Sequence, residues 1–117
     1  MSKLTSLAAF QGLFNRAPAV VEVPNVGTVS IRKLSAGEVS QWQAEIIGTD
    51  LKPTRDGLFR ADASLTARAI VDAQGAPVFA GTQQVLDELP ADVVRALGKA
   101  VREANKINAP AEEEAGN

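Results

Sequence analysis

The side chains that could carry out chemistry in this chain are limited, because its 117 residues include no histidine and no cysteine. Without them, Ser-His-Asp and Cys-His catalysis are impossible, and the commonest metal ligand and every thiolate are missing. A carboxylate pair or a Ser-Lys pair brought together by folding stays open as a catalytic arrangement. The residue types nevertheless predict a protein that is not an enzyme, with no cofactor and no metal site.

Three short motifs could bind a ligand, but an ordinary structural role is favoured for each. Asp72 to Gly75 supplies one carboxylate where a calcium loop needs several oxygen ligands, so a chain-reversing turn is favoured. Gly98-Lys99 lacks the upstream glycine of a phosphate-binding loop and lies in a helical pattern. Arg55-Asp56-Gly57 could be a recognition loop, although a polar turn is the more common structure for such residues.

Charge and hydrophobicity exclude further classes of partner. The net charge of −2 and the pI near 5.1 argue against nucleic acid, which requires a clustered positive field. No apolar run approaches the roughly 20 residues that span a bilayer. The N-terminal residues after Lys3 contain no continuous apolar segment of the secretory type, so we expect a cytoplasmic protein.

Local patterns predict a small single α+β domain. Residues 19–32 contain two β-branched runs around a Pro-Asn-Val-Gly connector, which predicts a β-hairpin. Alternating apolar residues before the Asp72 turn predict a second hairpin over residues 65–79. Residues 48–64 show no periodicity and are predicted to form a long loop.

Three helices are predicted, over residues 35–47, 82–89 and 90–107. Ser35 and Glu38 have the spacing of a capping box at the start of the first helix. The last helix has an apolar face opposite a basic stripe, and a solvated face is favoured over an acidic partner as the meaning of that stripe. The residues of the stripe are Arg95, Lys99, Arg102 and Lys106.

The domain is expected to cover residues 19–108, between two flexible terminal segments. Residues 1–18 can form a short amphipathic helix with Leu7, Phe10 and Phe14 near one stripe. Docking on the domain or disorder is favoured for this segment over a role in meeting a partner. Residues 109–117 are acidic and predicted to be disordered. A core position is favoured for Trp42, because tryptophan is highly buried on average.

The order of elements resembles the tail assembly chaperones of long-tailed bacteriophages, over about residues 19–108. The resemblance is carried by Ile31 to Glu38, where a hairpin leads into a Leu-Ser-x-Gly-Glu helix start. It is also carried by Ala67 to Phe79, with the Asp-Ala-Gln-Gly turn and the Phe that follows it, and by the closing helix that reaches Asn108.

This resemblance implies a non-enzymatic function. Such chaperones bind the tape measure protein, keep it soluble until tail tube subunits polymerise around it, and are absent from the finished virion. This chain would be the short form, with the tail tube protein, a longer frameshifted form and further copies of itself as additional partners. Its expected location is the cytoplasm of the infected bacterial host. The predicted contact residues are Leu7, Phe10, Phe14 and, if its ring is not buried, Trp42.

Two hypotheses of other classes stay open. A structural tail or head-completion protein would remain in the virion, whereas a chaperone would leave it. A small adaptor domain unrelated to phage would not suppress aggregation of a tape measure protein.

Overall fold

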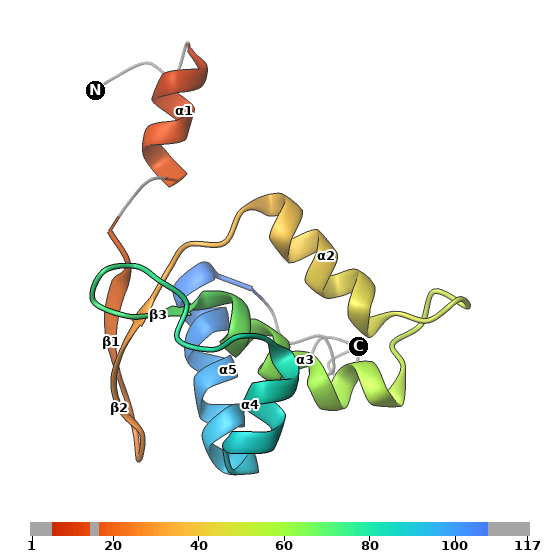
Figure 1. The fold of residues 1–117 in the computed structure, drawn as a ribbon. Helices are drawn as coiled ribbons and strands as arrows, with labels where there is room; N and C mark the ends of the chain where they lie inside the picture. Colours follow the sequence, from red (N-terminus) through yellow and green to blue (C-terminus); the bar gives the residue numbers. More distant parts are fainter. Residues whose placement is uncertain (1–5, 15–16, 108–117) are drawn as a thin grey trace.

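The computed structural model describes residues 6–14 and 17–107, which form five helices and a three-stranded antiparallel sheet (Figure 1). The predicted α+β fold class is confirmed. Helix α1, Leu7–Phe14, belongs to the predicted N-terminal segment and stands apart from the other elements (Figure 1). The predicted acidic tail, residues 109–117, lies outside the described residues.

The predicted first hairpin is confirmed. Strands β1, Ala19–Val23, and β2, Gly27–Ile31, pair in antiparallel register with Val21 opposite Val29. The connection is a type II turn, because the proline takes the first central position and Asn25 takes the second with a φ of 64°. The N–H of Val26 closes the turn on the carbonyl of Val23 at 3.0 Å.

Helix α2, Ala36–Ile46, begins at the predicted capping box. The Ser35 hydroxyl accepts a hydrogen bond from the N–H of Glu38 at 3.2 Å, and the Ser35 N–H donates to the Glu38 carboxylate at 3.1 Å. Two N–H groups that the first turn of a helix leaves unpaired are thereby satisfied. The predicted helix over residues 35–47 is confirmed.

The predicted loop over residues 48–64 is confirmed for residues 48–54 but wrong beyond them, because helix α3 spans Arg55–Ala69. The Thr54 hydroxyl caps this helix by accepting from the N–H of Gly57 at 2.8 Å. Arg55-Asp56-Gly57 is therefore the first turn of a helix and neither a recognition loop nor a polar turn. Helix α3 packs against α2, α4 and α5, so its apolar residues follow no single stripe.

The predicted second hairpin over residues 65–79 is confirmed only near its turn, where Ile70 and Asp72 form backbone hydrogen bonds with Val78 and Ala76. Residues 65–69 end α3, and the strand β3 that follows is only Ile70–Val71. This strand pairs with β2, and its other side has one bridge, between Val71 and Pro77. Alternating Leu, Ala and Arg residues are also good helix formers, and a helix covered on several sides can bury them without a one-sided stripe.

The predicted turn after β3 is confirmed. The Asp72 carboxylate accepts hydrogen bonds from the N–H groups of Gln74 at 2.9 Å and Ala76 at 3.0 Å. Gly75 has a φ of 85°, which residues with a side chain rarely adopt. After this turn Phe79 packs against the hydrophobic core, whereas Val78 is 49% exposed.

The last two helices are α4, Thr82–Glu88, and α5, Ala91–Asn105, in agreement with the predictions for residues 82–89 and 90–107. Helix α5 lies against α3 and against the strand β1. One continuous core therefore joins the sheet to α2, α3 and α5. Its buried members are Val23, Ile31, Leu34, Trp42, Ile46, Ala61, Leu65, Ala69, Ile70, Leu97 and Val101.

Candidate partner-binding surfaces

Helix α1 is an apolar helix that stands apart from the other elements (Figure 1). It contains no charged side chain, and its Leu7 is 73% exposed. The Ser6 hydroxyl accepts a hydrogen bond from the N–H of Ala9 at 3.2 Å and so caps the first turn. The side chains of Phe10 and Phe14, predicted to share the contact stripe with Leu7, lie outside what the structure describes.

Trp42 belongs to the core and offers no surface to a partner. Its side chain is fully buried, and its indole N–H donates to the carbonyl of Ala61 in α3 at 2.9 Å. A buried indole needs such an acceptor, because an unpaired polar group in the core costs free energy. The condition for Trp42 to act as a contact residue, an exposed ring, is therefore not met.

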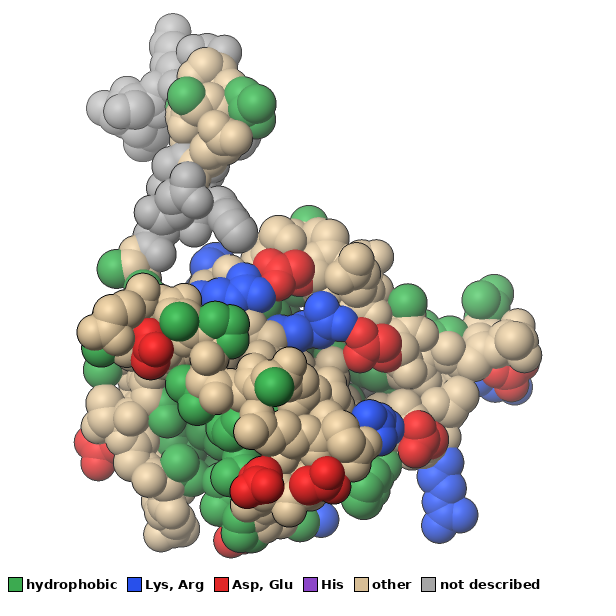
Figure 2. All heavy atoms as spheres, viewed as in Figure 1, with side chains coloured by type: hydrophobic (Ala, Val, Ile, Leu, Met, Phe, Trp, Pro, Cys, Tyr) green, Lys and Arg blue, Asp and Glu red, His purple; other side chains and the backbone are tan. Residues whose placement is uncertain are grey.

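A groove of about 640 Å³ lies between the β1–β2 hairpin and α5, and we call it the hairpin groove. Hydrophobic side chains gather between this hairpin and the helices α4 and α5 in Figure 2. On the strand side the groove is lined by valines of β1, and on the helix side by three alanines spaced four residues apart. The apolar lining residues are Val21, Val23, Pro24, Ala96, Ala100 and Ala104.

The rim of the hairpin groove is polar. Glu22 lies at its edge on the strand, and Lys99 and Glu103 lie at its edge on α5 with their charged groups 4.0 Å apart. Because small alanines line the helix side, an incoming element can approach the backbone of α5 closely. The arrangement of an apolar floor and a charged rim is typical of a site that takes the apolar face of a helix.

A second groove, of about 460 Å³, lies between α3, α4 and α5. Phe59 stands at its edge and is 76% exposed. Leu86 and Leu89 from the α4 region contribute to its lining. Local patterns could not reveal this groove, because residues 48–64 show no periodicity and only the helical register of α3 brings Phe59 beside α4.

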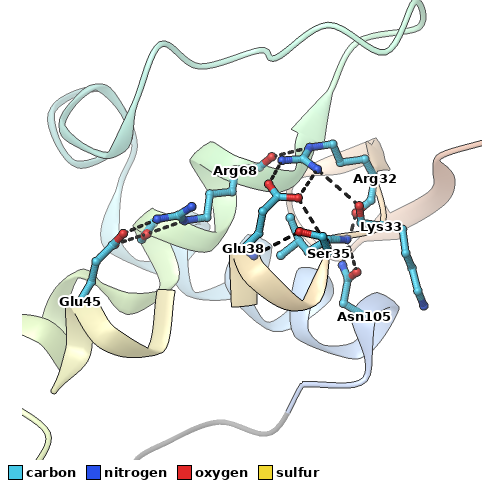
Figure 3. A network of polar contacts seen from close by, with 9 residues as sticks. Arg32, Lys33, Ser35, Glu38, Glu45, Arg68 and Asn105 are labelled. Atoms are coloured by element: carbon cyan, nitrogen blue, oxygen red, sulfur yellow. Dashed lines mark hydrogen bonds and ion pairs between the residues drawn. The ribbon is translucent and has the colours of Figure 1, made fainter. Parts of the chain in front are cut away.

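Polar side chains fasten the start of α2 to the end of α3 (Figure 3). The Arg32 guanidinium forms an ion pair with Glu38, and its Nε donates to the carbonyl of Arg68 at 2.8 Å. Arg68 in turn pairs with Glu45 of α2. Asn105, at the end of α5, accepts from the N–H of Leu34 at 2.8 Å.

This network stabilises structure and does not prepare a reactive group. The hydrogen bond from Arg32 is the largest cause that lowers the pKa of Glu38 to about 2, with smaller help from Ser35. The same hydrogen bond raises the pKa of Arg32 above its ordinary value. Both shifts favour the charged forms, so neither group is poised to exchange a proton near neutral pH.

The residues of the basic stripe predicted on the last helix lie in two different environments. Lys99 and Lys106 are exposed, in agreement with a solvated face. Arg102, however, has only 14% of its side chain exposed and pairs with Asp62 of α3. The sequence could not show this pair, because the residues around Asp62 have no periodicity that predicts a helix.

Two features, a cluster of metal ligands and a membrane-spanning helix, are absent from the described residues. No three acidic side chains gather in that part of the chain in a way that could hold a metal ion. None of the helices formed by residues 6–14 and 17–107 has the length and apolar character that crossing a bilayer requires.

Comparisons with protein-family models, with curated proteins and with solved structures found no match to this chain.

Proposed function

We propose that this protein is a tail assembly chaperone of a tailed bacteriophage, which binds the tape measure protein and keeps it soluble until the tail tube polymerises. It acts in the cytoplasm of the infected bacterium and leaves before the virion is complete. The resemblance of residues 19–108 to such chaperones motivates the proposal. The observation that carries it in this structure is the hairpin groove, an uncovered apolar channel with a charged rim.

The groove suits the chemistry of the proposed partner. A tape measure protein is a very long helical chain, and the apolar stripe of such a helix needs cover before assembly. The valines of β1 and the alanines of α5 would take that stripe, while Glu22 and Lys99 would face its polar flanks. The exposed Leu7 on α1 adds a second apolar contact that is independent of the groove.

Co-expression with the tape measure protein encoded in the same genome tests the proposal. We expect the wild-type chain to raise the soluble fraction of the tape measure protein and to copurify with it. Ala96→Glu places a charge in the groove, and Leu7→Glu places one on α1, so each is expected to reduce both readouts. Val78→Glu is the matched control, since Val78 is exposed but lies on neither surface.

The folding of each variant is checked by its thermal melting temperature. Leu7→Glu keeps the test decisive if Ala96→Glu unfolds, because α1 stands apart from the core (Figure 1). A tape measure protein that is equally soluble with and without the wild-type chain would overturn the proposal.

Mass spectrometry of purified virions separates the chaperone from a structural tail or head-completion protein. The chaperone is expected to be missing from the particles although it is present in the infected cell. Its recovery in particles, at a fixed ratio to the tail tube protein, would establish the structural alternative.

A further inference from the structure

The outer edge of β1 is the unprotected edge of the sheet. With strand order β1-β2-β3, the strand β1 has one neighbour, whereas the far side of β3 is covered. There the N–H of Val78 donates to the carbonyl of Ile70 at 3.2 Å, and the N–H of Asp72 donates to that of Ala76 at 2.8 Å. No strand or loop of the described residues pairs with the outer side of β1.

The hydrogen bonds of β2 determine which groups of β1 point outward. The N–H of Arg32 donates to the carbonyl of Ala69 at 2.9 Å, so the backbone groups of Arg32 point toward the β3 side. The backbone groups of successive strand residues alternate between the two neighbours, so those of Ile31 and Val29 point toward β1. Their partners in β1 are Ala19 and Val21.

It follows that Ala19, Val21 and Val23 direct their backbone groups toward β2. The two residues between them, Val20 and Glu22, direct both N–H and C=O outward. Val20 is also 70% exposed, and Glu22 is the one charged residue of the strand. An edge with so little charge and no proline within it is a template for pairing with another strand.

The geometry points to a second copy of this chain as the occupant, with the two β1 strands antiparallel about a two-fold axis at Val21. In this register Val20 of one copy lies opposite Glu22 of the other, and the same pair recurs on the far side of the axis. The outward groups then form two hydrogen-bonded pairs, which supply four N–H···O=C bonds. The two sheets become one sheet of six strands.

The neighbouring two-fold registers are poorer. An axis at Val20 places Glu22 opposite Pro18, which has no N–H to donate. An axis at Glu22 places two carboxylates directly opposite each other, which is destabilising. Only the axis at Val21 pairs every outward N–H and C=O of Val20 and Glu22 and keeps the like charges apart, and this self-complementarity is the reason for choosing a second copy.

Sedimentation velocity over a range of protein concentrations tests the pairing. The wild-type chain is expected to dimerise. Val20→Pro removes an outward donor without touching the bonds to β2, so it should weaken the dimer by about tenfold or more, since two N–H groups are lost per dimer. Val20→Thr, which keeps the N–H, is the matched control and should dimerise like the wild type.

Charge changes test the register. Val20→Glu places a carboxylate opposite Glu22 of the second copy and should weaken the dimer. Adding Glu22→Lys to that variant makes the facing pairs opposite in charge and should restore it. Each variant is checked for folding by circular dichroism, and the restored double variant would show that the single change did not act by unfolding.

Cross-linking gives an independent readout, because the natural sequence has no cysteine. In the proposed dimer the two Val21 residues form a non-hydrogen-bonded pair, with Cα atoms about 4.5 Å apart, a distance that a disulfide spans. Val21→Cys should therefore form a covalent dimer on oxidation. Thr28→Cys, one strand away from the axis, should not.

A wild-type chain that stays monomeric up to its solubility limit would overturn the inference and leave the edge to a strand of another protein. A dimer that Val20→Pro does not weaken would also overturn it. The inference does not rest on the proposed function, since every measurement uses the purified chain without a tape measure protein.

Discussion

Helices α3 and α5 are both fifteen residues long and lie against each other, yet their buried residues follow different patterns. Helix α5 buries one apolar face, including Leu97 and Val101, and leaves residues such as Lys99 in solvent. Helix α3 buries residues in every turn, and most of them are small. Its buried residues are Gly57, Ala61, Ala63, Ser64, Leu65, Thr66 and Ala69.

The difference shows that the position of a helix in the fold decides which side chains its positions can hold. Helix α5 meets solvent on one side, so the ordinary division into an apolar and a polar face serves it. Helix α3 has neighbours on several sides, and close approach of their backbones requires small side chains more than hydrophobic ones. Its buried hydroxyls are both hydrogen-bonded, since Thr66 donates to the carbonyl of Asp62 at 2.8 Å and Ser64 donates to the Glu45 carboxylate of α2 at 2.8 Å.

The largest effect is expected from adding a methyl group at the start of α3. A Cβ on Gly57 would lie 2.5 Å from the backbone oxygen of Ile46, so Gly57→Ala forces α2 and α3 apart. We expect a loss of about 3 kcal/mol in the free energy of unfolding, measured by urea denaturation.

Gly37→Ala in α2 is the matched control, since its nearest neighbour would be 3.9 Å away. It should leave stability unchanged or raise it by about 0.5 kcal/mol. Equal losses at Gly57 and Gly37 would contradict the view that α3 is limited by close approach.

The next effect compares the two sides of α5. Arg102→Ala removes the sheltered ion pair with Asp62 and should cost about 2 kcal/mol. Lys99→Ala removes the exposed pair with Glu103, whose side chains are 72% and 68% exposed, and should cost at most about 0.5 kcal/mol. Thermal melting of the two variants in the same buffer measures the difference. A larger loss from Lys99→Ala would reverse our assignment of the inner and outer sides of α5.

A smaller effect is expected beyond the end of α3, at the turn after β3. Gly75→Val should cost about 1 kcal/mol, because Gly75 has a φ of 85° and a β-branched residue is strained there. Gly81→Ala is the control, since Gly81 is extended and has open space around it. Urea denaturation measures both variants. A free energy of unfolding for Gly75→Val equal to that of the wild type would refute a stabilising role of this turn.

The smallest effect concerns the network that anchors the last turn of α3. Glu38→Gln removes the ion pair with Arg32 and should cost about 0.5–1 kcal/mol at neutral pH, because both side chains are partly exposed. The folded pKa of about 2 lies below the ordinary 4.5, so the wild type loses this stabilisation as pH falls between these values.

Urea denaturation at several pH values checks this prediction. The difference in stability between wild type and Glu38→Gln should be full above pH 4.5 and should shrink toward pH 2. A difference that is constant over this range would show that the carboxylate charge contributes nothing.

Local signals in the sequence determined much of the fold. Three of these signals depend only on neighbouring residues, because each one satisfies its backbone groups within a few positions. They are the Ser35–Glu38 capping box, the Pro24-Asn25 turn and the Asp72 turn. The single apolar face of α5 predicted that helix for the same reason. Whether the segment of Leu7 docks on the domain stayed open in the sequence, and in the structure Leu7 is exposed.

Tertiary structure alone decided the rest. Helix α3 has no single stripe to detect, since it has neighbours on several sides, and without it neither the Arg102–Asp62 pair nor the groove beside Phe59 can be foreseen. The burial of Trp42 depends on the carbonyl of Ala61 that α3 provides. The outward groups of Val20 and Glu22 depend on which edge of the sheet β3 covers. These features arise between segments distant in sequence, where local propensity carries no information.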